Sequence, residues 1–395
     1  MTAADPGAPL SGLRVVELAR ILAGPWIGQT LADLGADVIK VEAPEGDETR
    51  RWGPPFVQDA DGANLDAAYF HCCNRGKRSV IADFGSAQGR ELVLRLVDRA
   101  DVLIENFKTG SLRKFGLDHE TLRRRNPRLI YCSITGFGQD GPYSARPGFD
   151  AMIQAMSGMM DLTGEADGGP QKIGVALADI LTGVYGVVGI QAALANRERT
   201  GMGQQVDMAL FDVMVGVLAN QALNYFVSGD VPHRIGNAHP NIVPYQTFPV
   251  SDGHIMIAVG NDAQFTRLCA VIERPDLAKD EAYRTNAARV AQRAALVPLL
   301  TAELGRWRRD ALLSSLEAAE VPAGPINNLA DVFHDPQILA RKMRLNLPAA
   351  GVAGGAVSGL RTPIRLSVSS LCLERASPRL GEHTAEVARE LGLTL

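Results

Sequence analysis

Residues 13–42 read LRVVELARILAGPWIGQTLADLGADVIKVE, and this stretch decides the fold. An apolar run at Leu13–Leu18 is followed by a helical pattern that continues to about Leu34, and a second apolar run follows at Val38–Val41. Strand, helix and strand in this order are typical of a βαβ unit with a right-handed crossover. Three further apolar runs continue the alternation, at Ser79–Phe84, Val102–Glu105 and Leu129–Ile134. The sequence therefore predicts an α/β fold with a parallel sheet that is covered on both faces.

The loops after these strands combine glycine or proline with polar side chains. The carboxyl ends of parallel strands form the edge at which ligands bind, and small residues there allow a bulky ligand to approach. Taken singly, each loop is also typical of an ordinary connection. None of them has the dinucleotide fingerprint or the Walker pattern. The loops are residues 19–25, 42–47, 83–85, 106–110 and 135–138.

The composition changes after residue 228, where glycine, proline, histidine and asparagine predict a linker into a second domain. A hairpin pattern over 247–259 and helical patterns over 286–304 and 309–319 predict a small α+β domain. Strand-like runs at 343–347 and 364–367 and a final helix to Leu391 complete the chain. We expect a large domain over 1–225, a small domain over 226–338 and a C-terminal segment over 339–395.

The overall composition excludes several classes of protein. The 395 residues carry a formal net charge of −4, and no basic patch with interleaved aromatic residues predicts binding to nucleic acid. The five cysteines show no metal spacing and are odd in number, which favours reduced thiols and a cytoplasmic location. We see no signal peptide, no metal-ligand cluster and no apolar run approaching the roughly 20 residues of a membrane helix, so we expect no membrane partner.

A basic cluster stands out at Asn74–Arg78, which reads NRGKR. One interpretation is a solvated turn before a strand. The other is electrostatic attraction of an anionic ligand. Farther along, Glu382 and His383 suggest acid–base chemistry, but capping of the final helix accounts for them equally simply.

The stretch Gly174–Gly183 holds a single acidic residue, Asp179, among small and apolar residues, and a long apolar helical pattern follows it. One interpretation is an N-cap aspartate that satisfies the start of this helix. The other is a carboxylate nucleophile in a pocket with little water. The helix dipole favours the charged carboxylate, whereas burial raises its pKa. No GxSxG motif offers another nucleophile.

The chain resembles the class III CoA-transferase family, which includes the formyl-CoA and carnitine CoA-transferases and the α-methylacyl-CoA racemases. Each motif is loose, but the ordered set is specific and spans nearly the whole chain. The motifs are Leu10–Glu17, Ala23–Pro25, Leu34–Glu42, Asn74–Ser79, Glu105–Phe107, Arg146–Asp150, Asp179 and Leu380–Thr384.

This resemblance implies a Rossmann-like large domain, to which the C-terminal segment returns, and a small domain between the two parts. It also implies a homodimer whose two chains pass through each other like linked rings. No cofactor would be bound permanently, since coenzyme A enters and leaves as a substrate.

The resemblance further implies the chemistry. Asp179 matches the nucleophile of the family, which attacks an acyl-CoA thioester to give a mixed anhydride. The released CoA thiolate then forms an aspartyl-CoA thioester, and an acceptor acid reverses both steps. Such a relay needs neither ATP nor a metal, but it must exclude water.

The expected coenzyme A contacts also follow from the resemblance. Lys114 replaces an arginine of other members, which keeps the charge but loses the bidentate fork. Ala43 stands where some members have an arginine, and Arg50, Arg51, Arg75 or Lys77 are candidates to compensate. The expected contacts are Ala43, Ala82, Asp83, Phe84, Gly85, Asn106, Phe107, Lys108, Lys114, Pro147, Gly148, Phe149 and Asp150.

One position favours the transferase branch over the racemases. A racemase needs two opposed acid–base groups, and its branch has a histidine where this chain has Phe149, which cannot move a proton. Residues 237–241, with the expected substrate contacts His239 and Pro240, lack the glycine run of oxalate-specific members. We therefore predict transfer of CoA to a carboxylic acid, with a dicarboxylate such as succinate as a candidate acceptor. The alternatives are a racemase and a non-catalytic acyl-CoA binding protein.

Overall fold

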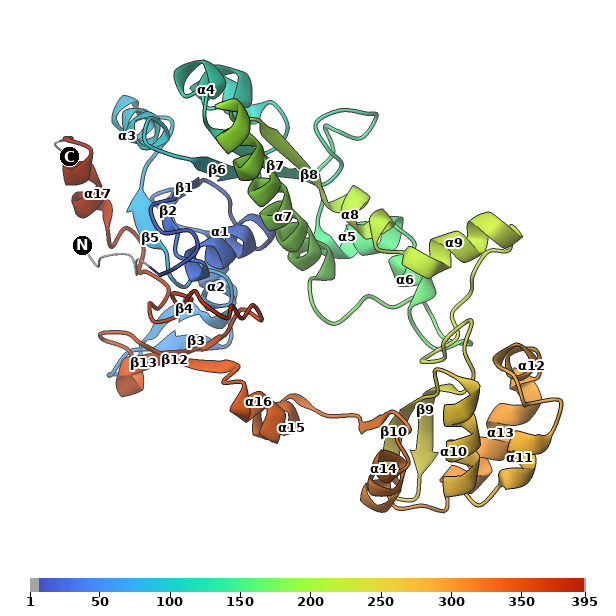
Figure 1. Ribbon diagram of the computed structural model, residues 1–395. Helices are drawn as coiled ribbons and strands as arrows, with labels where there is room; N and C mark the ends of the chain where they lie inside the picture. Colours follow the sequence, from blue (N-terminus) through green and yellow to red (C-terminus); the bar gives the residue numbers. More distant parts are fainter. Residues whose placement is uncertain (1–6, 394–395) are drawn as a thin grey trace. The chain divides into compact units, whose positions relative to one another are not determined.

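The computed structural model describes residues 7–393, and within this range the chain divides into two compact units (Figure 1). The first unit comprises the chain up to Met159, Lys172–Leu223 and the residues from Gln337 onward. The second comprises Met160–Gln171 and Asn224–Pro336. The sequence-based boundaries at 225/226 and 338/339 thus differ from the structural ones by about two residues, and they place 160–171 in the large domain.

The first unit is built on a parallel sheet of six strands in the order β5-β2-β1-β6-β7-β8. The expected parallel α/β sheet is therefore confirmed, and all of its strands except β8 come from the predicted apolar runs. Their bounds are β1 Arg14–Glu17, β2 Asp37–Glu42, β5 Arg78–Ile81, β6 Val102–Glu105, β7 Ile130–Thr135 and β8 Gln205–Ala209.

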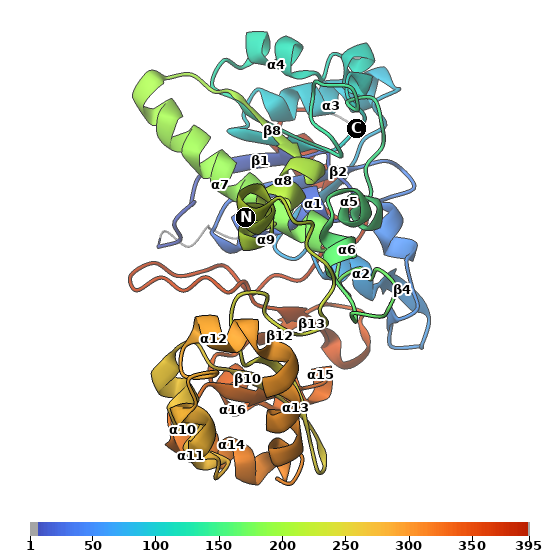
Figure 2. The same cartoon turned by 90° about the vertical axis from the view of Figure 1, so that its right-hand side faces the viewer.

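Helices cover both faces of this sheet. Figure 2 shows α3 and α4 on one side of the strands and α1 and α7 on the other. Two hydrophobic cores follow, because alternate strand residues such as Val15 and Val16 point to opposite faces. The helices of this unit are α1 Ala23–Asp33, α2 Ala68–His71, α3 Ala87–Val97, α4 His119–Arg125, α5 Asp150–Met156, α7 Leu177–Thr200, α8 Leu210–Gly216 and α17 Thr384–Glu390, with 3₁₀ turns at Glu48–Arg51, Ser111–Phe115 and Ala353–Gly355.

Helix α7 packs closely against α1 because it presents glycines to it (Figure 1). A Cβ atom on Gly183 would lie 2.9 Å from a ring carbon of Trp26 and 3.1 Å from the carbonyl oxygen of Ala23. One on Gly186 would lie 2.4 Å from the Cδ1 atom of Ile27. These glycines therefore set the separation of the two helices at the start of α7.

By length and composition alone, α7 is also long and apolar enough to cross a membrane. No uninterrupted apolar run of about 20 residues marks α7 in the sequence, because polar residues such as Asp179 and Gln191 interrupt it. Almost half of the apolar part of α7 is buried, against α1 and β8 among others, and the core helix of a soluble protein passes the same test.

Two small hairpins extend the first unit. One pairs β3 Phe56–Gln58 with β4 Asn64–Ala67, and these strands of three and four residues were not predicted. The other pairs β12 Arg344–Pro348 with β13 Ala356–Leu360. The first of these two strands was expected, but residues 364–367, predicted as a strand, are irregular.

The second unit contains an antiparallel sheet in the order β11-β10-β9. The predicted hairpin forms β9 Tyr245–Val250 and β10 Gly253–Ala258, and β11 Ala323–Pro325 adds an unpredicted edge. The single helical pattern over 286–304 splits into α12 and α13. The helices of this unit are α10 Asp262–Val271, α11 Pro275–Lys279, α12 Asn286–Ala291, α13 Arg293–Leu304, α14 Arg309–Ala318 and α15 Leu329–His334, and α6 Met159–Leu162, α9 Ala219–Ser228 and α16 Pro336–Ala340 lie where the chain passes between units.

Candidate active site

Asp179 lies in the first turn of α7 but does not cap it. The N-cap residue is Ala176, whose side chain makes no capping bond. The backbone N–H of Ala178 donates instead to the carboxylate of Asp150, at 2.8 Å. Interpreting Asp179 as an N-cap is therefore wrong, because an aspartate from α5 does that work and leaves the Asp179 carboxylate uncommitted.

The surroundings of Asp179 favour the protonated form more than usual. Burial raises the pKa of this half-buried carboxyl to about 7, with a further contribution from the nearby charge of Asp150. The backbone N–H of Ala23, at the start of α1, faces the carboxylate and opposes this rise. Within residues 7–393, no ion pair reaches Asp179. The site thus holds a carboxylate that is half ionised near neutral pH and has no cation beside it.

Tyr69 of α2 is a neighbour that the sequence analysis missed. Burial raises the pKa of its phenol, and the charge of Asp179 raises it further. The phenol therefore stays a neutral hydrogen-bonding group beside the carboxylate. No motif marks Tyr69, because its place next to Asp179 arises only from the tertiary fold.

The loop after β1 and the loop after β6 are fastened together by Asn106. Its side-chain amide donates to the carbonyl oxygen of Arg20 at 2.7 Å, and its carbonyl oxygen accepts from the backbone N–H of Arg20 at 2.9 Å. The Arg20 guanidinium lies 5.3 Å from the ring centre of Phe107 and pairs with Glu48 at 2.6 Å. Arg20 thus joins the predicted contacts Asn106 and Phe107 at the ligand edge of the sheet.

Aromatic rings connect further members of the predicted set. The ring centres of Phe84 and Phe107 are 6.1 Å apart, and so are those of Phe84 and Phe115. Lys114 places its ammonium 4.7 Å from the Phe115 ring. The loops after β5 and β6 therefore meet at one edge. Of the other predicted contacts there, Ala82 is buried, Asp83 accepts from the N–H of Gly85, and Ala43 and Lys108 are exposed.

The basic cluster Asn74–Arg78 is neither solvated nor available to a ligand. Arg75 is buried and paired with Asp33, and Lys77 is buried and paired with Glu17. Arg78 is buried beside Asp37. Both interpretations of this cluster are therefore wrong, because each cation has a buried or partly buried anion as its partner.

The same contacts reduce the number of residues that could replace the arginine missing at Ala43. Arg50 is buried and bonds Glu42 at 2.7 Å, and Arg75 and Lys77 are committed to the pairs above. Of the four candidates, only Arg51 is exposed, and it donates to the carbonyl oxygen of Glu45.

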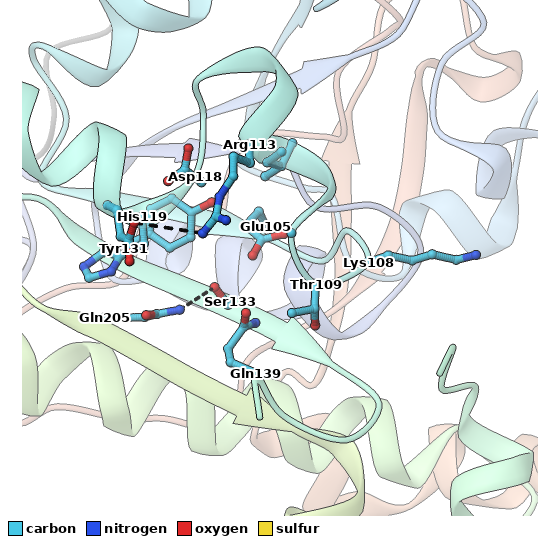
Figure 3. A pocket seen from close by; sticks show the side chains of 13 residues that line it. Glu105, Lys108, Thr109, Arg113, Asp118, His119, Tyr131, Ser133, Gln139 and Gln205 are labelled. Carbon is cyan, nitrogen blue, oxygen red and sulfur yellow. Dashed lines mark hydrogen bonds and ion pairs between the residues drawn. The ribbon is translucent and has the colours of Figure 1, made fainter. Parts of the chain in front are cut away.

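A polar hollow of about 260 Å³ lies beside the loop after β6 (Figure 3). Burial raises the pKa of Glu105 in its wall to about 7, although the N–H of Phe107 and the hydroxyl of Ser133 oppose the rise. The side chain of Lys108 extends away from the other labelled groups (Figure 3). Asp179 does not line this hollow, so it is separate from the surroundings of that carboxylate.

The segment Pro147–Asp150 approaches the loop after β7 closely. A Cβ atom on Gly148 would lie 2.3 Å from the Cα atom of Gly136, so neither glycine tolerates a side chain. The next residue, Phe149, is 63% exposed although it is a large apolar side chain. It stands directly before Asp150, and its role as a coenzyme A contact stays a prediction.

The expected substrate contacts lie in the second unit. His239 packs its ring 5.2 Å from that of Tyr245 and accepts at Nδ1 from the N–H of Asn241. The carbonyl oxygens of His239 and Pro240 both accept from Arg293. Their backbone is therefore fixed within this unit.

His383 is a structural residue. It is buried, its Nδ1 atom accepts from the N–H of Ser79, and its Nε2 atom contacts Arg375. Burial lowers its pKa, and Arg375 lowers it further. It fastens the C-terminal segment to β5. The described residues contain no group of His, Cys, Asp and Glu that could hold a metal ion.

A family model described as CoA-transferase family III matches residues 10–384. The chain belongs to CoA-transferase family III. It is 57% identical to a succinate–glutarate CoA-transferase of Agrobacterium fabrum over 97% of this chain and 96% of that protein. A succinyl-CoA:mesaconate CoA-transferase of Haloarcula hispanica is 42% identical, over 97% and 96% of the two chains.

A solved relative agrees with this family III assignment. The crystal structure of a CaiB/BaiF family protein from Brucella suis is 62% identical and superimposes with a TM-score of 0.86. The match covers 98% of this chain and all of the other. The chain is therefore an enzyme of the CoA-transferase type that uses CoA thioesters as substrates.

Proposed function

We propose that this family III enzyme transfers coenzyme A from an acyl-CoA donor to a dicarboxylate acceptor, with Asp179 as the nucleophile. The observation that carries the proposal is the half-buried Asp179 carboxylate, which no cation neutralises and which the N–H of Ala23 faces. The names of the two relatives reported above support a dicarboxylate acceptor such as succinate or glutarate.

The proposed first half-reaction consists of two substitutions at carbonyl carbon. An oxygen of Asp179 attacks the thioester carbon of the donor, and the C–S bond breaks to give a mixed anhydride and the CoA thiolate. The thiolate then attacks the aspartyl carbonyl carbon, which releases the donor acid as its carboxylate and leaves an aspartyl-CoA thioester. No proton is gained or lost, so Asp179 must start ionised.

The second half-reaction repeats these steps in reverse. The acceptor carboxylate attacks the aspartyl-CoA carbonyl and releases the thiolate, which attacks the acyl carbonyl of the new anhydride and restores Asp179. In both halves negative charge develops on a carbonyl oxygen next to Asp179. The N–H of Ala23 already points at an Asp179 oxygen, and a donor in that place stabilises such charge.

Mass spectrometry of quenched reactions tests this proposal. The enzyme is mixed briefly with succinyl-CoA or glutaryl-CoA and quenched with hydroxylamine, which attacks the aspartyl-CoA thioester, releases the CoA thiol and leaves a hydroxamate. We expect the hydroxamate on Asp179 and its loss in Asp179→Ala. Asp212→Ala is the matched control, because Asp212 is an exposed acid in the first turn of α8. It should leave the label unchanged.

Three outcomes would contradict the proposal. The first is the absence of label with every thioester together with deuterium uptake at the α-carbon of a branched acyl-CoA, which would establish a racemase. The second is transfer to monocarboxylates at the rate for dicarboxylates, which would exclude the proposed acceptor class. Tight binding of CoA with neither label nor exchange would establish a binding protein.

We also propose that two copies form the interlocked homodimer implied by the family resemblance. The exposed face of α7 carries Val184, Tyr185 and Val188, and the last of these is 59% exposed. Helix α9 has no buried residue, and its Phe226 is 72% exposed. Apolar surfaces of this kind are typical of sites that another protein covers. Light scattering should give twice the chain mass, and a monomer would overturn this point.

We further propose a cytoplasmic location, which the five free cysteines support.

A further inference from the structure

Four buried charges form a cluster beneath the loop after β1. They are Glu17 of β1, Lys40 of β2, Asp47 and Lys77, and each is at most 1% exposed. The ammonium of Lys40 lies 3.1 Å from Glu17 and 2.9 Å from Asp47, and that of Lys77 lies 2.8 Å from Glu17. We call these four residues the buried charge cluster. Parallel pairing of β1 with β2 sets Glu17 directly beside Lys40.

The charges of the cluster are mutually satisfied. Burial would raise the pKa of Asp47, but Lys40 and the N–H of Thr49 hold it at about 2. Burial would lower the pKa of Lys40, but Asp47 and Glu17 raise it above its ordinary value. Burial lowers the pKa of Lys77, and Glu17 opposes this shift, so each cation of the cluster has a carboxylate that favours its charged form. Apolar side chains of similar volume would fill such a core at least as stably, so stability alone does not account for the cluster.

Three members of the cluster also bond the backbone of residues 19–25, which we call the active-site turn. Lys40 donates to the carbonyl oxygen of Ala19, and Lys77 donates to that of Pro25, each at 2.9 Å. The carboxylate of Asp47 accepts from the N–H of Ile21 at 3.2 Å. The cluster thus holds both ends of the turn and a point within it.

The backbone of the active-site turn needs this support. Ile21 has φ of 71°, a left-handed conformation that a β-branched residue rarely adopts. The buried thiol of Cys73 contacts its carbonyl oxygen at 3.5 Å, and Asn106 holds both polar groups of Arg20. Such strained residues persist only where the surrounding structure fixes them, and they occur at functional sites.

We propose that the buried charge cluster is a positioning device, which fixes the active-site turn so that the N–H of Ala23 faces the Asp179 carboxylate. The turn includes the start of α1 at Ala23, and the N-cap residue Leu22 makes no side-chain bond that would hold the helix start by itself. The inference deepens the proposed function and rests on it, because the oriented N–H matters only if Asp179 reacts.

This arrangement has a consequence for the titration of Asp179. The groups that face its carboxylate are Asp150 of α5, Tyr69 of α2 and the N–H of Ala23. The N–H is the one that favours the ionised form. If the turn relaxes and moves this N–H, the titration midpoint of Asp179 rises and less nucleophile is present at neutral pH.

The direct variant, Lys40→Met, leaves two buried anions short of a partner and can prevent folding. Ile21→Gly avoids this difficulty, since it keeps all four charges and only frees the backbone of the turn. We expect Ile21→Gly to bind CoA with a Kd within about twofold of the wild type and to melt at a similar temperature. The rate at which donor acyl-CoA labels Asp179 at pH 7 should fall at least about tenfold, and its pH midpoint should rise.

Glu273→Gly is the matched control, because Glu273 also has a positive φ, of 58°, but lies in the second unit and outside the site. It should change neither the labelling rate nor the midpoint. Labelling of Ile21→Gly at the wild-type rate with an unchanged midpoint would overturn the inference. Absence of label in the wild type would instead overturn the proposed function. In that case the midpoint of Asp179, followed by carboxyl ¹³C resonances assigned with Asp179→Asn, still decides whether the turn controls the carboxylate.

Discussion

Two carboxylates of the first unit, those of Glu17 in β1 and Asp179 in α7, have opposite electrostatic surroundings. Glu17 is fully buried and lies between two ammonium groups, at 2.8 Å from Lys77 and 3.1 Å from Lys40. Asp179 is half-buried and has another carboxylate, Asp150, as its charged neighbour. The Glu17 carboxylate is paired with two cations, whereas the surroundings of Asp179 raise its pKa and disfavour its ionised form.

The difference separates a structural charge from a reactive one. Paired charges in a buried site fix geometry, because each ion has one favourable arrangement with its partners. A carboxylate without a cation keeps its lone pairs available to attack an electrophile. The active-site turn, which the cluster holds through Ala19 and Pro25, includes Ala23, whose N–H faces the Asp179 carboxylate.

Removing a cation from the paired region should have the largest effect. Lys77→Met takes away the 2.8 Å partner of Glu17 and the donor to the carbonyl oxygen of Pro25. Breaking a buried pair by removing one partner costs about 3–5 kcal/mol in the free energy of unfolding. Urea denaturation measures this loss.

The matched control is Arg95→Met. Arg95 forms an i,i+4 pair with Glu91 at 2.6 Å, but both side chains are exposed. Such a pair contributes about 0.5 kcal/mol or less. Equal losses in the two variants would show that the buried charge cluster is no more important to stability than a surface pair.

Neutralising the unpaired carboxylate should stabilise the protein. The folded pKa of Asp179 is about 7, against an ordinary value of 3.8, so ionisation costs the folded state stability as the pH rises from about 4 to about 7. Asp179→Asn removes this cost. At pH 8 we expect it to raise the free energy of unfolding by about 2 kcal/mol, after allowance for solvent screening, and much less at pH 4.

The pH dependence of the wild-type transfer rate tests the same raised pKa of Asp179. Because the ionised carboxylate is the proposed nucleophile, the transfer rate should rise with pH through about 7 and then level off. A stability gain of Asp179→Asn that is equal at pH 4 and pH 8, or a flat pH–rate profile, would contradict the raised pKa.

A change where α1 contacts α7 should have an intermediate effect on stability. A Cβ atom in Gly183→Ala would lie 3.1 Å from the carbonyl oxygen of Ala23 and 2.9 Å from the Trp26 ring, so α1 and α7 must move apart. Overpacking of this kind costs about 1–3 kcal/mol. We expect thermal unfolding at a lower temperature and slower labelling of Asp179.

Gly216→Ala is the comparison for this variant. A Cβ atom there would meet no atom within 4 Å among the described residues, and alanine is the better helix former. It should be neutral or slightly stabilising. A Gly183→Ala variant that behaves like Gly216→Ala would show that the spacing of α1 and α7 does not control the site.

Much of this architecture could be predicted from local patterns. The strands of the parallel sheet follow apolar runs such as Val102–Glu105, and the ligand edge follows from the chain order of strands and loops. The short strands Phe56–Gln58 and Asn64–Ala67 escaped prediction, because segments of three and four residues are too short to show a periodic pattern.

The partners of the charged residues could not be predicted from local patterns. Lys77 belongs to a basic run, and only the fold shows that Glu17, sixty positions earlier, neutralises it. Asp179 was found as the one acid of a small apolar stretch, but the residue that replaces it as a cap, Asp150, lies in another helix. Local sequence therefore indicates which side chains are unusual, whereas their partners depend on long-range packing.

The smallest effect on stability is expected at the rim of the reactive region. Phe149 is 63% exposed, so Phe149→Ala should change the free energy of unfolding by no more than about 0.5 kcal/mol. Phe149 directly precedes Asp150, whose carboxylate accepts from the N–H of Ala178, the residue before Asp179. We therefore expect a severalfold rise in the KM for acyl-CoA, measured by steady-state transfer. Val368→Ala, which trims a side chain that is 95% exposed, should leave both stability and KM unchanged. If the two variants have the same KM, the exposure of Phe149 has no connection with substrate, and the reactive region ends at Asp150.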